Sequence, residues 1–228
     1  GPNRNPPPSM PSDPFAQHPT DDTRGRILSA AEALFASQGV DRTTMRELAT
    51  VAGVNVAAAN YHFRSKDALA EAVFERIGQR VNTQRLGALE ACLAAAQAQG
   101  QRPALRPIIE SFVRPYIQSE GHDGLLLARF ILQHRLNPTP MTARILEKHF
   151  DPMAKRYIAA LGQALPHLDA VEHYWRYNFM VSTVVLTVTD RGANNRLARL
   201  SGGQANPGRT EDLHHYLIRY LEGSVGAG

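Results

Sequence analysis

The side chains best suited to chemistry lie in residues 44–66, where polar and basic residues stand among small apolar ones. Arg46 carries a guanidinium that can bind O6 and N7 of a guanine through two parallel hydrogen bonds, and the amide of Asn60 can read an adenine. Val56 and Ala57 are small and apolar, which suits contact with a thymine methyl group. This pattern predicts recognition of base edges, with no bond made or broken.

Two short helices joined by a glycine turn are predicted to position these side chains. Thr44 and Glu47 have the spacing of a capping box, so a helix is expected to start there. Apolar residues recur at helical spacing up to Gly53, where a positive φ is easiest and the chain is expected to turn. Asn55 is a good N-cap for the next helix. A short turn between two helices is typical of a helix-turn-helix, whose second helix lies in the major groove.

The segments around this motif also have helical periodicity. A first helix, capped by Asp22, is expected to run to Ser37, and a fourth is expected over residues 66–98, long enough to leave the DNA-binding unit. Helical stripes then continue to the end of the chain. They are interrupted at Pro115, near Pro152 in a helix over 141–165, and by a loop over 191–209 that is predicted to be mobile. Since no strand pattern or repeat is visible, the prediction is an all-α fold of about nine helices.

The 228 residues divide into three predicted parts. Residues 1–20 are rich in proline and are expected to form a disordered arm. Residues 21–83 are expected to form the helix-turn-helix domain, and residues 84–228 a second helical domain for ligand binding and dimerisation. The net charge of +4 permits nucleic-acid binding without demonstrating it.

The segment from about Thr23 to Val81 resembles the DNA-binding domain of the TetR/AcrR family of transcriptional regulators. The likeness rests on three motifs that need no gap: A-x-x-L-F-x-x-x-G, T-x-x-x-L-A-x-x-A-G-V and N-Y-H-F-x-S-K-x-A-L. The resemblance implies a TetR-like, all-α homodimer on a palindromic, double-stranded DNA operator. It further implies that the protein most often represses transcription and that a small-molecule effector releases it from the operator.

The resemblance also indicates which residues hold the DNA backbone. Tyr61, His62 and Lys66 match family positions that bind phosphates, which fix the register without reading the sequence. The Thr44 hydroxyl faces a phosphate or only caps its helix, and the two roles can coexist. His62 contacts a phosphate or packs against a phenylalanine at the helix end. Asn55, at the exposed start of the second helix, completes the predicted DNA-binding set.

Two apolar stripes near the end of the chain are candidates for a dimer interface. They follow residues 169–190 and 211–222 at helical spacing. In the family, the last two long helices form a four-helix bundle with those of a second copy, and a symmetric DNA target favours a dimer. The alternative is that both stripes serve only the core of the monomer. The predicted interface residues are Trp175, Phe179, Leu213, Tyr216, Leu217 and Tyr220.

The second domain is predicted to hold the effector. Residues 150–157 and 173–180 are similar to the branch of the family that regulates fatty-acid degradation, which suggests an acyl chain or acyl-CoA. Dicarboxylate, aromatic and drug-like ligands stay open as alternatives. Taken one by one, these side chains favour an ordinary core over a ligand site. The predicted lining residues are Phe112, Tyr116, Leu126, Phe130, Phe150 and Tyr157.

Other classes of protein lack their signatures in this sequence. There is no G-x-S-x-G, P-loop, dinucleotide fingerprint or H-E-x-x-H motif, so we expect no enzyme and no cofactor. His214 and His215 are adjacent, and neighbouring helical residues point ~100° apart, so no metal site is expected. The single Cys92 fits a reducing compartment. No apolar run approaches the ~18 residues needed to cross a bilayer, so no membrane contact and a cytoplasmic location are expected.

Two alternatives stay open at the level of sequence. The chain could be a DNA-binding regulator without a small ligand, controlled by a protein partner, and its second domain would then contain no cavity. It could also be an enzyme with an appended DNA-binding domain, which turnover of an added substrate by the pure protein would reveal.

Overall fold

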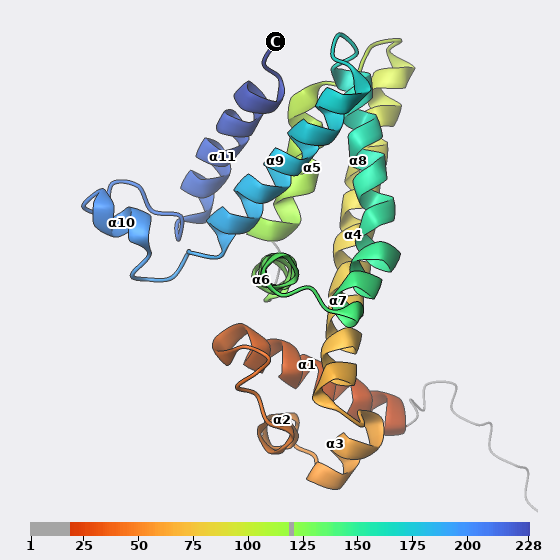
Figure 1. Ribbon diagram of the computed structural model, residues 1–228, viewed down its shortest axis with the longest axis vertical. Coiled ribbons are helices and arrows are strands. Elements are labelled where there is room, and N and C mark those ends of the chain that lie inside the picture. The colour runs from red at the N-terminus through yellow and green to blue at the C-terminus, as the bar shows by residue number, and fades with distance from the viewer. Residues whose placement is uncertain (1–18, 119–120) are drawn as a thin grey trace, which may run out of the picture.

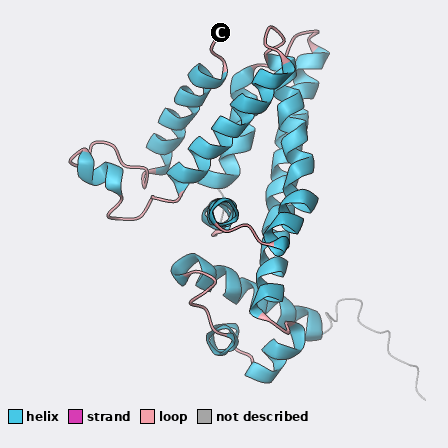
Figure 2. Ribbon diagram, in the orientation of Figure 1, coloured by secondary structure: helices cyan, strands magenta, loops and turns pink. Residues whose placement is uncertain are grey.

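The computed structural model describes residues 19–118 and 121–228, and every regular element in these ranges is helical (Figure 1 and Figure 2). The all-α prediction is confirmed for these ranges, which contain eleven α-helices and one π-helical segment in place of the nine or so helices expected. In chain order the elements are α1 (Pro19–Gln38), α2 (Met45–Ala52), α3 (Val56–His62), α4 (Lys66–Ala98), α5 (Leu105–Ile117), α6 (Asp123–Leu136), α7 (Pro140–Ile145), η1 (Leu146–Phe150), α8 (Asp151–Ala164), α9 (Ala170–Val188), α10 (Arg196–Leu200) and α11 (Thr210–Val225).

The first helix begins earlier than predicted. α1 starts at Pro19, so Asp22 lies inside the helix and does not cap it. A proline suits the first turn of a helix, because the N–H that it lacks would have no acceptor there. Apart from Pro19 and Thr20, the predicted disordered arm lies outside the described residues.

Helices α1 to α3 form the lower part of the molecule in Figure 1, where α1 packs against α2, α3 and α4. Ile27 and Phe35 of α1, Leu48 of α2, Ala59 of α3 and Leu69 of α4 are all buried in this core. Burying a large apolar side chain stabilises a fold by about 1.5–3 kcal/mol. The short helices α2 and α3 therefore depend on their packing against α1 for their position.

Helix α4 belongs to both halves of the molecule. Its 33 residues correspond to about 50 Å, and Figure 1 shows it running from the lower half to the far end of the upper half. Leu69, Val73, Ile77 and Val81 recur every four residues along its buried face. The domain boundary predicted between residues 83 and 84 falls within this helix, so the two halves are joined by continuous helix.

The upper half contains α5, α8, α9 and α11, with α6 crossing below them and seen end-on in Figure 1. Helix α5 is central, because it contacts α4, α6, α8, α9 and α11. The sequence predicts that the helix is kinked or ended at Pro115, but α5 does not end there and continues to Ile117. A proline so close to the C-terminus removes only one hydrogen bond of the last turn.

The helix predicted over residues 141–165 consists of three elements that follow without a loop. The π-helical turn η1 lies between α7 and α8, directly before Asp151 and Pro152. Pro152 lacks the N–H that an α-helix would need at this point, and the wider turn accommodates it. The interruption therefore falls at residues 146–150, slightly earlier than expected.

Residues 191–209, predicted to be a mobile loop, contain α10 and have their own hydrogen bonds. Asn195 is buried, and its Nδ2 donates to the Gly192 carbonyl at 2.9 Å and to Asn206 Oδ1 at 2.8 Å. The polar side chains of the segment thus give it a defined conformation, which the content of glycine and asparagine alone does not reveal.

Candidate DNA-binding surface and effector cavity

A glycine and an arginine fix the turn between α2 and α3. Gly53 has a φ of +68°, which favours glycine, and its N–H closes α2 on the carbonyls of Ala49 and Thr50. From α1, Arg26 Nη2 donates to the carbonyl oxygens of Ala52 (2.7 Å) and Gly53 (3.0 Å). A Cβ at position 53 would lie 2.8 Å from this nitrogen. The angle between the two helices therefore depends on α1 as well as on the motif.

Helix α3 has one buried and one exposed side. Ala59 and Phe63 are buried and anchor the helix on the core. Val56, Ala57 and Asn60 are exposed on the opposite side. These three predicted base readers are therefore accessible to a DNA groove.

The two helix caps are formed by residues of the predicted DNA-binding set. Asn55 Oδ1 accepts the N–H of Ala58 at 2.7 Å, which leaves its Nδ2 for DNA. Thr44 Oγ1 accepts the N–H of Glu47 at 3.2 Å, and Glu47 Oε2 accepts the N–H of Thr44 at 3.0 Å. This backbone N–H and the side chain of Gln38, which donates at 3.1 Å, hold the pKa of Glu47 below its ordinary value. Thr44 therefore acts as a cap whether or not it also faces a phosphate.

The side chains predicted to contact DNA differ in their exposure and in the contacts that they already make within the protein. Tyr61 is 79% exposed, and its ring meets the half-buried ring of His62 edge-on, with 5.4 Å between the centroids. Lys66 Nζ donates to the Asp41 carbonyl at 3.0 Å and so ties the start of α4 to the loop before α2. Arg46 is exposed, and its side chain makes no hydrogen bond with the described residues. Tyr61 and Arg46 are thus the most available of these side chains.

Two further exposed arginines flank this surface and are absent from the predicted set. Arg42 lies in the loop before α2, and Arg64 lies between α3 and α4. Arg42 stands two residues before Thr44, and Arg64 stands between Tyr61 and Lys66. This closeness to predicted DNA contacts is the signal that marks them, since phosphate contacts need positive charge more than a particular geometry.

A cavity of 470 Å³ opens among α4, α5, α6, η1, α8 and α9. Its volume lies in the range of small-molecule sites, ~300–1,000 Å³. The predicted effector residues that line it are Phe112, Tyr116, Phe150 and Tyr157. Leu126 and Phe130 are buried but do not line it, and the Phe130 ring packs 4.5 Å from that of Phe74. Helical periodicity marks all six side chains as inward, but not which of them meet a void.

Polar side chains also line the cavity, and the apolar pattern of the sequence does not reveal them. They are Arg85 of α4, His134 and Arg135 of α6, Asp151 of α8, and Tyr177 and Asn178 of α9. Arg85 continues the buried stripe of α4 four residues after Val81 and is itself buried. A charged residue at a core position is the signal that the sequence carries for this site.

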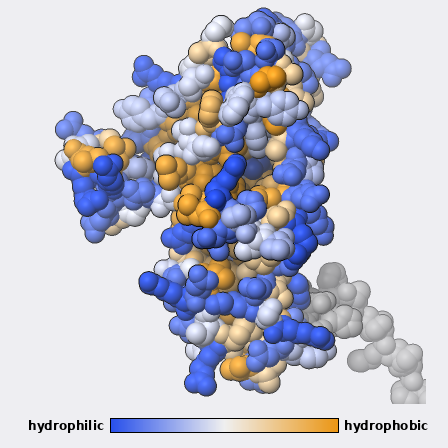
Figure 3. Space-filling view, viewed as in Figure 1, coloured by the Kyte–Doolittle hydropathy of each residue, from blue (hydrophilic) through white to orange (hydrophobic). Residues whose placement is uncertain are grey.

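Helices α9 and α11 expose large aromatic side chains on the upper half. Trp175 is 56% and Tyr216 65% exposed, and Phe179 stacks on Trp175 with 5.8 Å between the ring centroids. Leu213 and Leu217 are buried in the monomer, and their edges line a groove of 330 Å³ shared with Tyr216 and Tyr220. Figure 3 shows hydrophobic surface on the projecting α10 lobe as well, where Leu197 and Leu200 are exposed. Exposed apolar surface of this extent marks an interaction site.

Comparison with known families explains the two halves. Residues 110–224 match the family described as tetracyclin repressor-like, C-terminal domain, and residues 27–73 match the bacterial regulatory proteins of the tetR family. The chain belongs to the TetR family. It is therefore a DNA-binding transcriptional regulator, and the curated relatives that it matches are regulators rather than enzymes.

Individual relatives of this TetR-family regulator agree on the fold. The HTH-type transcriptional dual regulator CecR of Shigella flexneri is 35% identical over 130 residues, which are 56% of this chain and 58% of that protein. The solved ketosteroid transcriptional regulator of Mycobacterium tuberculosis covers 90% of this chain and 95% of its own, with a TM-score of 0.61 and 18% identity. The fatty acid degradation regulator FadR of Bacillus halodurans covers 93% and 97%, with a TM-score of 0.60 and 12% identity. At such identities the two structures show the fold alone.

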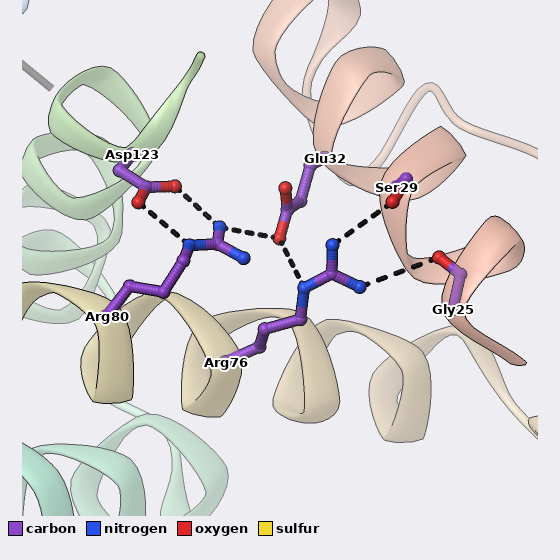
Figure 4. Close-up of polar contacts among 6 residues, drawn as sticks. All are labelled: Gly25, Ser29, Glu32, Arg76, Arg80 and Asp123. Carbon is purple, nitrogen blue, oxygen red and sulfur yellow. Dashed lines mark hydrogen bonds and ion pairs between the residues drawn. The ribbon is translucent and has the colours of Figure 1, made fainter. Parts of the chain in front are cut away.

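Ion pairs connect the two halves of this regulator (Figure 4). Arg80 of α4 binds both carboxylate oxygens of Asp123, at the start of α6, at 2.6 and 2.9 Å. It also binds Glu32 of α1 at 2.8 Å, and Glu32 pairs with Arg76 at 3.3 Å. These carboxylates, Asp123 foremost, raise the pKa of Arg80 above its ordinary value. The first turn of α6 is thereby linked to α1 through α4.

Helix α6 is also tied directly to its neighbours. Arg129 Nη1 donates to the Ala36 carbonyl near the end of α1 at 2.7 Å. At the other end of α6, a Cβ on Gly124 would lie 2.2 Å from the Tyr116 carbonyl oxygen, so only glycine allows α6 to approach α5 this closely. Since Tyr116 lines the cavity, α6 links the cavity to the DNA-binding half.

The described part of the chain contains no group of three or more His, Cys, Asp or Glu residues that could hold a metal ion. In the same ranges, no helix is both long and apolar enough to span a bilayer.

Proposed function

We propose that this TetR-family regulator is a homodimeric repressor that a small effector releases from a palindromic operator. The observation that carries the proposal is the cavity of 470 Å³, because α4 and α6 line it and both also contact α1 of the DNA-binding half. A ligand bound in this cavity would contact helices that also pack against the DNA-binding half. It also makes control by a protein partner alone the weaker alternative.

In the proposed complex, α3 enters the major groove and few polar groups read bases. Arg46 binds a guanine and Asn60 an adenine, while Val56 and Ala57 meet thymine methyl groups. Asn55 belongs with them at the start of α3. The predicted backbone contacts are Thr44, Tyr61, His62 and Lys66, to which we add Arg42 and Arg64, because both are exposed.

Dimerisation is proposed through α9 and α11. The exposed rings of Trp175, Phe179, Tyr216 and Tyr220 support this surface, with Leu213 and Leu217 beneath it. A symmetric dimer would present two α3 helices about one DNA turn apart, ~34–36 Å, or a multiple of it. The operator is therefore expected to be palindromic.

Release follows if the effector prefers a state with another spacing of the two α3 helices. An effector that contacts α5 and α6 would shift α6 against α1, because Gly124 and Arg129 couple these helices. The fall in operator affinity then equals the differential affinity of the effector for the two states.

The proposal is tested by selecting DNA from a random pool with the full-length protein. We expect a palindromic sequence to be enriched, to bind as a protein dimer, and to be released by a compound that raises the melting temperature. A relative carries the name dual regulator, so a promoter assay should score activation as well as repression. Enrichment of a single half-site, or an operator complex insensitive to every stabilising compound, would contradict the proposal.

A further inference from the structure

Arg85 is the most unusual side chain in the cavity. It is 3% exposed, although it carries a charge, and its guanidinium carbon lies 4.3 Å from the centre of the Phe112 ring and 5.0 Å from that of Tyr116. It also lines the cavity of 470 Å³. Aromatic faces offset only part of the free energy that it costs to bury a guanidinium. An anionic partner would therefore stabilise Arg85 further.

No carboxylate of the described residues lies within ion-pair distance of Arg85. Its Nε and Nη2 donate to the Phe112 carbonyl at 3.3 and 2.8 Å, which occupies one edge of the guanidinium. The other edge, formed by Nη1 and Nη2, has the fork geometry that matches a carboxylate. The Tyr116 hydroxyl also interacts with Arg85, whose charge opposes the rise that burial causes in the pKa of this tyrosine.

The remaining charges around the cavity do not neutralise Arg85. Asp151 is the one acidic residue of the lining, and it is exposed, while Arg135 and His134 add further basic groups on α6. The lining therefore carries more positive than negative charge. This balance favours an anionic ligand over a neutral or cationic one.

We infer that the cavity binds an organic carboxylate with an apolar body, held by Arg85 at its carboxylate and by the aromatic side chains along its body. The inference rests on the proposed function and names the chemical class of the effector. Phe112, Phe150 and Tyr157 supply the apolar walls. Because Arg85 lies on α4, roughly 28 Å along the helix from Lys66, the ligand carboxylate acts on the helix that starts beside α3.

The tyrosines of the cavity fit this assignment. Burial raises the pKa of Tyr116 and Tyr177, and the charge of Arg85 opposes the shift in both cases. Both hydroxyls therefore stay protonated at neutral pH and can donate hydrogen bonds to a carboxylate. A thioester such as an acyl-CoA has no carboxylate at this point and cannot use Arg85 in the same way.

The test compares matched pairs of ligands on the full-length protein: octanoate with octanamide, phenylacetate with phenylacetamide, and octanoyl-CoA as a third arm. Affinities are measured by calorimetry and by the rise in melting temperature. At least one acid is expected to bind about tenfold or more tightly than its amide, which is typical of a charge-assisted pair. Equal binding of acid and amide, binding of the thioester alone, or no binding of any acid at millimolar concentration would overturn the inference.

Variants at position 85 test the residue itself. Arg85→Met is expected to remove the preference for acids, leave amide binding within about twofold, and melt no lower than the wild type without ligand, since it removes an unpaired buried charge. Arg85→Lys should restore part of the preference. Arg102→Met, at an exposed position outside the lining, is the matched control and should change acid binding less than twofold. A preference that survives Arg85→Met would overturn the inference, and the wild-type comparison decides alone if this variant does not fold.

The same measurements separate the inference from the proposed function. If an amide binds as well as its acid and releases the operator, the carboxylate site is refuted and effector control stands. If an acid binds through Arg85 and leaves the operator complex intact, the carboxylate site stands and release by this ligand is refuted.

Discussion

The DNA-binding surface and the effector cavity differ in how far apart in the sequence the residues that form them lie. The surface is shaped within α1 to α3, by contacts between sequence neighbours such as Thr44 with Glu47, and by Arg26 of α1 on the turn. The cavity is lined by residues from Arg85 to Val181, contributed by six elements. A DNA-binding surface whose geometry is set within α1 to α3 keeps its shape when the helices of the upper half move, whereas a cavity made by several of those helices changes shape with them. This difference suits a protein in which one part recognises and the other responds.

The largest expected effect comes from separating the two copies. Phe179→Arg places a charge on the exposed aromatic face of α9 and should prevent dimerisation. Operator affinity should fall by at least about a hundredfold, because specific binding exceeds non-specific binding by ~10³–10⁷. Sedimentation and fluorescence anisotropy measure both quantities.

Gln163→Arg, on an exposed position of α8, is the control for that variant and should stay dimeric. A Phe179→Arg protein that remains a dimer with full operator affinity would remove α9 from the interface.

The next effect tests the close contact inside the effector half. Gly124→Ala forces a methyl group against the Tyr116 carbonyl oxygen, so α6 must shift from α5 at a cost of about 1–3 kcal/mol in unfolding free energy. Gly87→Ala is the matched control, because position 87 of α4 is exposed and a Cβ there has no neighbour within 4 Å. It should raise the unfolding free energy by up to about 1 kcal/mol. Equal unfolding free energies for the two variants would show that α5 and α6 are not locked at Gly124.

A change in the reader should affect binding and leave stability alone. Asn60→Ala removes an exposed amide and should weaken operator binding by ~1–3 kcal/mol while relaxing the preference at one base pair. Its melting temperature should match that of the wild type. Gln97→Ala, at the far end of α4, is the control. An unchanged base preference in a repeated DNA selection would take Asn60 off the list of base readers.

The smallest effect concerns the cap of α2. The pKa of Glu47 is lowered, so its contribution to stability is present above the ordinary pKa of 4.5 and is lost as pH falls through the lowered value. Glu47→Gln should therefore be less stable than the wild type at neutral pH, with the gap closing in acid. The difference in stability is measured by thermal unfolding of both proteins at several pH values between neutral and acidic. A gap that is constant with pH would mean that the charge of Glu47 plays no part in the cap.

The same difference in sequence separation explains which features can be predicted from the sequence. The caps at Thr44 and Asn55 and the glycine turn at Gly53 are local, so their pattern is legible in the sequence and the structure has all three. The clamp of Arg26 on this turn is not legible, because it joins residues far apart in the chain.

In the cavity, the sequence separates inward from outward side chains but not one inward side chain from another. Phe112 and Phe130 have the same periodic signature, yet only Phe112 meets the void, because the packing of α6 on α4 decides which ring is covered. Arg85 lies on the same buried face of α4 as Val73, Ile77 and Val81. A charged residue on this apolar face is the one feature of the sequence that indicates the cavity.

The measurement that tests the central claim most directly is the affinity of an effector for the free dimer and for the operator-bound dimer. By linkage, a ligand that releases the protein must bind the free form more tightly, by the same factor by which it weakens operator binding. We predict a ratio of about 5–150 for a carboxylate that binds through Arg85. Equal affinities for the two forms would contradict the account, because the cavity would then have no influence on α3.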